Sequence, residues 1–217
     1  KIIDKFSFIG YTSLGFFTLS FIFLFTKDFI IQLISIFNNL VDTEQPIDDS
    51  KRDFIKKSIT LGIIGISGTA TGFGFYNSRK GPSVIKQDIF LESLPESFNN
   101  FTIAQISDLH VGPTIKRPYV ENVLDKISIH NPDLIAVTGD LVDGSVQYLR
   151  SDLAPLKDMI APFGTYFVTG NHEYYSGVDL WLDETDRLGM KNLINSNELV
   201  SRLGDQIAIA GITDLKA

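Results

Sequence analysis

Two long apolar runs near the N-terminus predict helices that cross a membrane. Residues 6–25 carry no charged side chain, and a helix of about 20 apolar residues spans the hydrocarbon core of a bilayer. Residues 58–76 are also uncharged but rich in glycine, serine and threonine, residues that are common where membrane helices pack together. A buried core helix is the alternative for the first run, but its unbroken apolar length favours a membrane span.

The segments between and around these runs suggest an orientation. Residues 29–41 are apolar but short, so they either lie at the membrane interface or continue the first helix, and the acidic residues 42–50 predict a loop. We expect a basic loop between the two spans, and its basic residues are Lys27, Lys51, Arg52, Lys56 and Lys57. The positive-inside tendency places this loop in the cytoplasm and the C-terminal part on the extracytoplasmic side.

The sequence SKRDFIK, residues 50–56, has a second interpretation. It is similar to a twin-arginine export signal, except that Lys51 stands where the first arginine is expected. A basic flank of a membrane helix explains the same residues equally well.

From about residue 84 the pattern changes to short strands that alternate with helices. Strands are expected at residues 84–91, 101–107, 133–139, 164–170 and 206–212. Helices are expected at residues 118–130, 146–160 and 178–188, with a first-turn proline at Pro118, a break at Pro155 and a C-terminal cap at Gly189. We therefore predict a membrane-anchoring region over residues 1–80, and an α/β domain over residues 81–217.

The distribution of charged residues along the chain indicates which classes of partner it could bind. Residues 81–217 hold 19 acidic and 10 basic residues, whereas residues 1–80 hold 7 acidic and 9 basic ones. An acidic domain repels the phosphate backbone, so we expect no nucleic acid partner. The basic and apolar N-terminal region suits contact with a lipid bilayer. The chain has no cysteine, which excludes disulfides and thiolate metal ligands.

Three of the predicted strands end in polar side chains that can bind metal. Asp108 and His110 follow the first, Asp140 follows the second, and Asn171 and His172 follow the third. Sites in α/β sheets form beyond the carboxyl ends of the strands, so these side chains should meet. Each fragment alone is weak, because a single Asp-x-His or Gly-Asp is common in turns, but three in this order are specific.

The residue types suggest how such a site would work. Carboxylate, imidazole and amide groups together suit manganese, iron or zinc ions. Two such ions would bind a phosphate and activate water, with the Asp140 carboxylate able to bridge them. His172 could then donate a proton to the leaving oxygen. Asp143 and Glu173 are placed to orient the metal ligands from behind, and Gly139 and Gly170 let the backbone approach the site.

The motifs Asp108-Leu109-His110, 139–143 (GDLVD) and 170–173 (GNHE) resemble those of the calcineurin-like metallophosphoesterase family. The resemblance runs from about residue 101 to 173, and membrane-anchored members have a similar hydrophobic front. It implies a metallophosphoesterase-type β-sandwich flanked by helices, with two divalent or trivalent metal ions. It also implies that Asp108 and His110 bind one metal, that Asp140 bridges, that Asn171 binds the second and that His172 is catalytic.

The sequence departs from the family where further histidines are expected on later strands. It contains only three, at positions 110, 130 and 172. We expect a C-terminally truncated chain that, by itself, binds metal poorly and turns over slowly or not at all.

The leading hypothesis is a membrane-anchored, metal-dependent phosphoric ester hydrolase. Its substrate would carry a phosphodiester, phosphomonoester or pyrophosphate bond and could be a membrane lipid, because the anchor keeps the domain close to the bilayer. The alternative is a membrane-tethered binding or scaffold domain with a non-catalytic phosphoesterase fold.

Overall fold

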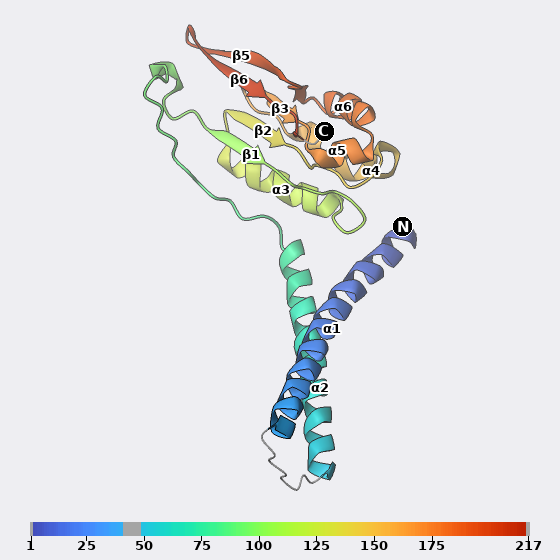
Figure 1. The fold of residues 1–217 in the computed structure, drawn as a ribbon. Helices are drawn as coiled ribbons and strands as arrows, with labels where there is room; N and C mark the ends of the chain where they lie inside the picture. The colour runs from blue at the N-terminus through green and yellow to red at the C-terminus, as the bar shows by residue number, and fades with distance from the viewer. Residues whose placement is uncertain (1, 41–48, 216–217) are drawn as a thin grey trace. The chain divides into compact units, whose positions relative to one another are not determined.

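The structure, a computed structural model, describes residues 2–40 and 49–215. The chain divides into two compact units, Lys1–Lys80 and Gly81–Ala217, and each is described by itself. The first holds helices α1 (Ile2–Leu40) and α2 (Asp49–Arg79). The second holds η1 (Glu96–Phe98), β1 (Ile103–Ile106), α3 (Arg117–His130), β2 (Leu134–Thr138), α4 (Val146–Leu153), η2 (Ala154–Asp158), β3 (Thr165–Val168), α5 (Asn171–Ser176), α6 (Val178–Arg187), β4 (Lys191–Asn192), β5 (Ser196–Arg202) and β6 (Asp205–Gly211) (Figure 1).

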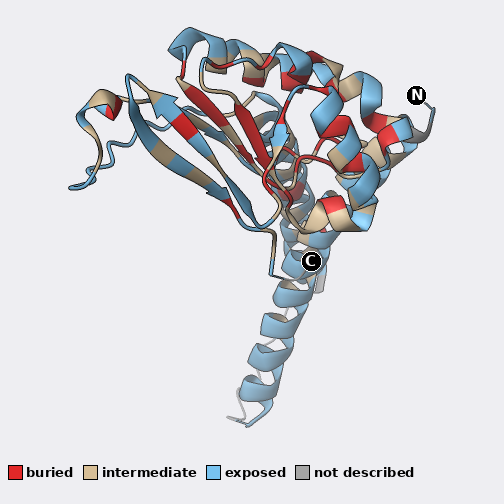
Figure 2. Cartoon of the chain, turned by 90° about the horizontal axis from the view of Figure 1, so that it is seen from above, coloured by how far each residue is buried: buried red, intermediate tan, exposed pale blue. Residues whose placement is uncertain are grey.

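Helices α1 and α2 are both long and apolar enough to cross a membrane. Helix α1 continues without a break through residues 29–40, which decides between the two possibilities left open for that segment. Its 39 residues make it about 58 Å long, roughly twice the thickness of a hydrocarbon core. Both helices expose apolar side chains along most of their length (Figure 2).

The expected basic loop is wrong over residues 49–57, because α2 already begins at Asp49. Lys51, Arg52, Lys56 and Lys57 therefore lie in its first turns. These residues and their neighbours include no proline or glycine, and straight-chain side chains favour a helix. The acidic segment predicted as a loop, residues 42–50, lies outside the described residues apart from its last two positions.

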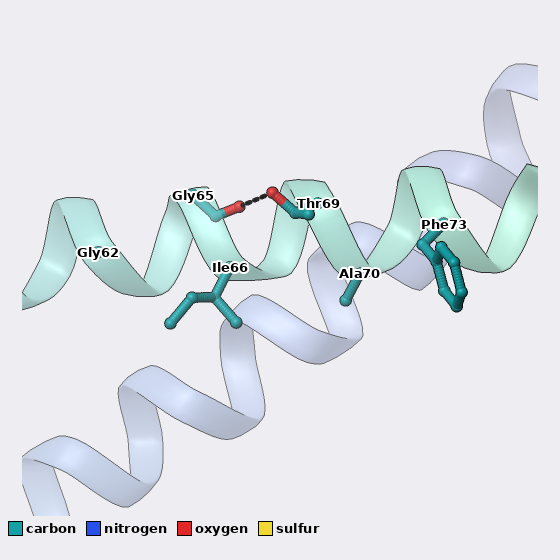
Figure 3. A pocket seen from close by; sticks show the side chains of 6 residues that line it. All are labelled: Gly62, Gly65, Ile66, Thr69, Ala70 and Phe73. Atoms are coloured by element: carbon teal, nitrogen blue, oxygen red, sulfur yellow. Dashed lines mark hydrogen bonds between the residues drawn. The ribbon is translucent and has the colours of Figure 1, made fainter.

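Small and polar residues line the contact between the two helices. Ser20 and Ser67 are buried there, and the Lys27 ammonium group donates to the Thr60 hydroxyl over 3.4 Å. At another level the rings of Phe8 and Phe75 meet edge to face, 5.0 Å apart. A further face of α2 forms an open groove lined by Gly62, Gly65, Ile66, Thr69, Ala70 and Phe73 (Figure 3).

A four-stranded parallel sheet organises the second unit, in the order β1-β2-β3-β4. Alternate residues of each strand face opposite sides. Ile135, Val137 and Phe167 pack in the core beneath α3, α4 and α6. Leu134 and Tyr166 pack on the other side, against Val200 of the antiparallel hairpin β5–β6. The unit is thus the predicted α/β fold, with helices on one face of the sheet and a second, two-stranded sheet on the other (Figure 1).

One predicted strand is wrong. Residues 84–91 form no regular element, and within the described residues no strand pairs with them. Ile85 is 88% exposed and Phe90 is 92% exposed. An apolar segment becomes a strand only when a neighbouring strand accepts and donates its backbone hydrogen bonds, and among residues 2–40 and 49–215 β1 pairs with β2 alone.

Candidate metal centre

The site lies where β1, β2 and β3 end. The three strands are adjacent and parallel, so their carboxyl ends meet at one edge of the sheet. An isolated bridge between Val111 and Val142 continues the pairing of the first two segments beyond the strands. The third segment enters helix α5 directly, so that Asn171 and His172 open a helix instead of following a strand into a loop.

Left-handed backbone turns bring the acidic and histidine side chains together. Asp108, His110 and Asp140 have φ angles of 56°, 48° and 52°, a conformation that is uncommon outside glycine and often marks a functional site. Two hydrogen bonds hold the turns together. The Asp108 amide donates to the Gly139 carbonyl over 3.2 Å, and the His110 amide donates to the Asp140 carbonyl over 3.0 Å.

Two glycines allow the second and third segments to touch. A Cβ atom at Gly139 would lie 2.5 Å from the amide nitrogen of Gly170. A Cβ atom at Gly170 would lie 2.2 Å from a carboxylate oxygen of Asp140. Because real Cβ atoms do not approach that closely, a side chain at either position would push the two segments apart.

Asp143 joins the two histidines. Its Oδ1 atom lies 3.0 Å from Nδ1 of His110 and 2.5 Å from Nδ1 of His172. The two rings are 4.5 Å apart and nearly perpendicular. Since a carboxylate only accepts hydrogen bonds, each Nδ1 atom is the donor to Asp143, and each Nε2 atom is left for another partner.

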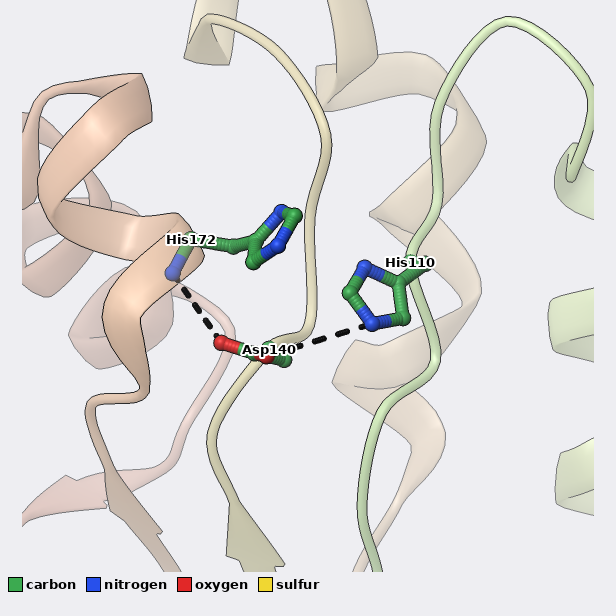
Figure 4. A group of neighbouring side chains, drawn as sticks. All are labelled: His110, Asp140 and His172. Carbon is green, nitrogen blue, oxygen red and sulfur yellow. Dashed lines mark hydrogen bonds and ion pairs between the residues drawn. The ribbon is translucent and has the colours of Figure 1, made fainter. Parts of the chain in front are cut away.

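The Asp140 carboxylate lies between His110 and His172 (Figure 4). One of its oxygens is 3.9 Å from His110 Nε2, which is also 3.8 Å from a carboxylate oxygen of Asp108. Its other oxygen accepts the His172 backbone N–H over 3.0 Å. Ligand atoms of His110, Asp140 and His172 all lie within 4.8 Å of one another.

Asn171 contributes a further oxygen. Its amide oxygen lies 3.1 Å and 3.2 Å from the two carboxylate oxygens of Asp140. Oxygens that face one another at this distance repel, unless the amide turns its nitrogen inward or a cation lies between them. The carboxylate and imidazole groups fit a divalent or trivalent metal ion, because their ligand atoms converge on one space, and the amide of Asn171 lies beside them.

Electrostatics in the cluster support the same conclusion. Partial burial lowers the pKa of His110, but its hydrogen bond to Asp143 and the charges of Asp143, Asp140 and Asp108 outweigh this effect, so the pKa is raised. The acidic groups thus favour a positive charge at this position. A bound metal ion would supply that charge and displace the proton.

Glu173 ties the second and third segments together from behind. Its side chain is 1% exposed and accepts backbone N–H groups of Gly170, Leu141 and Asp140 at 2.7, 2.8 and 3.0 Å. Burial raises the pKa of Glu173, although the three hydrogen bonds act in the opposite direction. The carboxylate thus holds the backbone of Asp140 and of Asn171 in place without entering the cluster.

All seven residues singled out in the sequence lie in this cluster or directly behind it. Sequence reasoning did not find that one carboxylate, Asp143, contacts both histidines. Trp181 lies buried in α6, and its indole N–H donates to the carbonyl of Gly144 over 3.0 Å, a contact that the sequence did not predict. The aromatic residue alone carried no signal for this contact, because Gly144 lies 37 positions away.

Comparison with known proteins agrees with this geometry. The family model for calcineurin-like phosphoesterases matches residues 101–213. The chain belongs to this family. A transmembrane protein with metallophosphoesterase domain from Danio rerio is 32% identical over 97% of the chain and 48% of its own length. A Bos taurus protein of the same name is 36% identical over 66% of the chain and 34% of its own length.

Bacteria contain similar proteins. An uncharacterized metallophosphoesterase of Helicobacter pylori is 30% identical over 76% of the chain and 42% of its own length. The chain thus spans about half, or less, of the length of these three relatives. The names of the vertebrate relatives and the two apolar helices together support a membrane-associated metallophosphoesterase.

Proposed function

We propose that the protein to which this chain belongs is a membrane-anchored hydrolase of phosphoric esters that uses two metal ions. The observation that carries the proposal is the position of the Asp140 carboxylate. The Nε2 atom of His110 lies 3.9 Å from one of its oxygens, and the amide of Asn171 lies 3.1 Å and 3.2 Å from the two. A carboxylate approached by donors from two separate segments suits a bridge between two ions.

The remaining ligands follow from this arrangement. Asp108 and His110 would hold the first ion together with Asp140, and Asn171 would hold the second with the same carboxylate. Manganese, iron and zinc all suit this donor set. When bound, such ions neutralise the charge of the phosphate and activate water for attack on phosphorus.

His172 is the proposed proton donor to the leaving oxygen. Asp143 holds its Nδ1 atom, which fixes the ring and leaves Nε2 directed away from that carboxylate. Asp143 would therefore pair with His172 for proton transfer while it orients His110 for metal binding.

The substrate class follows from the chemistry and from the anchor. Phosphodiesters, phosphomonoesters and pyrophosphates all present the same phosphate oxygens to this site. We favour an ester carried by a membrane lipid, because the second of two apolar helices ends fewer than 30 residues before β1. We also favour the extracytoplasmic side, because the basic residues at the start of α2 belong on the cytoplasmic side.

The test uses the full-length protein loaded with manganese and bis-(p-nitrophenyl) phosphate as substrate. Asp140→Asn and His172→Ala should each lower kcat/KM at least about a hundredfold. His130→Ala is the matched control, because His130 is exposed at the end of α3, and it should hydrolyse at the rate of the unaltered protein.

Two outcomes would count against the proposal. Hydrolysis that survives chelation of the metal would exclude the metal mechanism. Metal binding without mutation-sensitive hydrolysis of monoesters and diesters would favour the tethered binding domain instead.

A further inference from the structure

Helix α5 places one aromatic side chain beside the proposed proton donor. Asn171 and His172 occupy its first turn, and Tyr175 follows three positions after His172. Residues three and four apart on a helix lie on the same side. The rings of His172 and Tyr175 are accordingly neighbours, with centroids 5.7 Å apart and planes at 63°.

Tyr175 has no evident structural task. Its side chain is 75% exposed, and no described residue forms a hydrogen bond with its hydroxyl group. The preceding residue differs. Tyr174 is half-buried, and its hydroxyl accepts a hydrogen bond from Thr169 over 3.3 Å. Tyr174 therefore packs against the segment that precedes α5, whereas Tyr175 faces solvent at the rim of the metal centre.

The surroundings of Tyr175 define what it could bind. The side chains of the centre itself are carboxylates, imidazoles and one amide, all suited to metal ions and phosphate oxygens. Tyr175 adds an uncovered aromatic surface on the His172 side of the centre. An aromatic side chain has few rotatable bonds, so a ligand that packs on it incurs little loss of entropy.

We propose that Tyr175 is a specificity-determining residue, which binds the organic group of the ester beside His172 and favours a flat, unsaturated group over a small alkyl group. This inference rests on the proposed function, because it takes the phosphate to lie at the metal centre. An ester whose leaving oxygen lies against His172 has its leaving group next to Tyr175. A flat group there can stack on the ring or meet its edge.

The experiment measures binding without turnover. Phenylphosphonate and methylphosphonate carry the same metal-binding head and differ only in the organic group. Their dissociation constants are determined by calorimetry on the full-length, manganese-loaded protein. Four proteins are compared, namely the unaltered protein, Tyr175→Ala, Tyr175→Phe and, as the matched control, Tyr174→Phe.

We expect the unaltered protein to bind phenylphosphonate roughly three- to tenfold more tightly than methylphosphonate. Tyr175→Ala should abolish this preference and leave methylphosphonate binding within about twofold, whereas Tyr175→Phe and Tyr174→Phe should keep it. In hydrolysis of bis-(p-nitrophenyl) phosphate, Tyr175→Ala should raise KM by a similar factor with less effect on kcat.

The inference is overturned if Tyr175→Ala retains the preference, or if the unaltered protein shows none. It is also overturned if Tyr175→Phe loses as much as Tyr175→Ala, since the hydroxyl group and not the ring would then be responsible. These outcomes are independent of turnover. If the protein binds both phosphonates but hydrolyses no ester, the proposed function is contradicted. The dissociation constants alone then decide whether Tyr175 selects the organic group.

Discussion

Glycines with positive φ angles occur both inside and outside the metal centre. Gly139 has a φ of 79°, and Gly189, the cap after α6, has a φ of 89°. The two differ in the space around them. A Cβ atom at Gly139 would meet the backbone of Gly170 at 2.5–2.7 Å, whereas nothing lies within 4 Å of a Cβ atom at Gly189. Alanine substitutions at Gly139 and Gly189 therefore separate the free-energy cost of a strained φ angle from that of a steric clash.

Gly139→Ala should lower the free energy of unfolding by roughly 2–4 kcal/mol, and Gly189→Ala by about 1 kcal/mol. The larger loss arises because backbone atoms of the neighbouring segment cannot rotate away as a side chain does. Gly139→Ala should also weaken manganese binding, since it separates Asp140 from Asn171. Urea unfolding and metal titration of the two variants measure both effects. Equal losses in the two variants would contradict the close approach seen at Gly139.

Helices α4 and α6 are joined by a buried carboxylate. The Glu184 side chain is 1% exposed and forms ion pairs with Arg187 at 2.6 Å and with Arg150 of α4 at 3.1 Å. The hydrogen bond from Arg187 lowers the pKa of Glu184, against the opposing effect of burial, and the charges of both arginines add to the decrease. The folded state thus favours the ionised carboxylate more than the unfolded chain does.

This difference gives a signed dependence on pH. Because the pKa of Glu184 is lowered on folding, its stabilising contribution is complete above the ordinary value of 4.5 and is lost as the pH falls through the lower, folded value. Glu184→Gln should cost roughly 1–3 kcal/mol at pH 7, and this cost should shrink below about pH 4.

Urea unfolding of the protein and the Glu184→Gln variant, each at pH 7 and pH 3.5, measures the effect. Glu121→Gln is the control, because Glu121 pairs with Arg117 on the exposed side of α3 and such pairs contribute little. A cost for Glu184→Gln that is the same at both pH values would contradict the ion-pair account.

Element by element, the sequence predicted the structure where local signals were strong. Strands β1, β2, β3 and β6 and helices α3, α4 and α6 lie where apolar periodicity, Pro118 and Gly189 indicated. The break at Pro155 is the change from α4 to η2. Among the strands and α-helices, three were missed. β4 has two residues, β5 is largely polar, and α5 has six residues that carry no strong helix preference.

At the scale of the whole molecule, the two units differ in character. The first is basic and apolar, with two helices that could each span a membrane, and the second is acidic and carries the metal centre. Membrane association is supported by the relatives. The side on which the acidic unit lies is a proposal that rests on the basic residues at the start of α2.

Cysteine labelling can test this orientation, because none of the 217 residues is cysteine. Ser151 is exposed in the acidic unit, and Asp53 is exposed near the start of α2. We expect a membrane-impermeant maleimide to modify Ser151→Cys in intact cells, and to modify Asp53→Cys only after permeabilisation. The unaltered protein, treated in the same way, corrects for background. The reverse pattern would place the metal centre in the cytoplasm.

The sequence by itself determined the two long apolar helices, the α/β class and the polar residues that follow three strands, because each depends on residues close together in the chain. The tertiary structure alone decided how those residues meet. Asp143 contacts His172 across 29 positions, and Glu173 binds the Asp140 amide across 33. No local pattern encodes such contacts, since they arise only when parallel pairing of β1, β2 and β3 brings three distant strand ends to one edge.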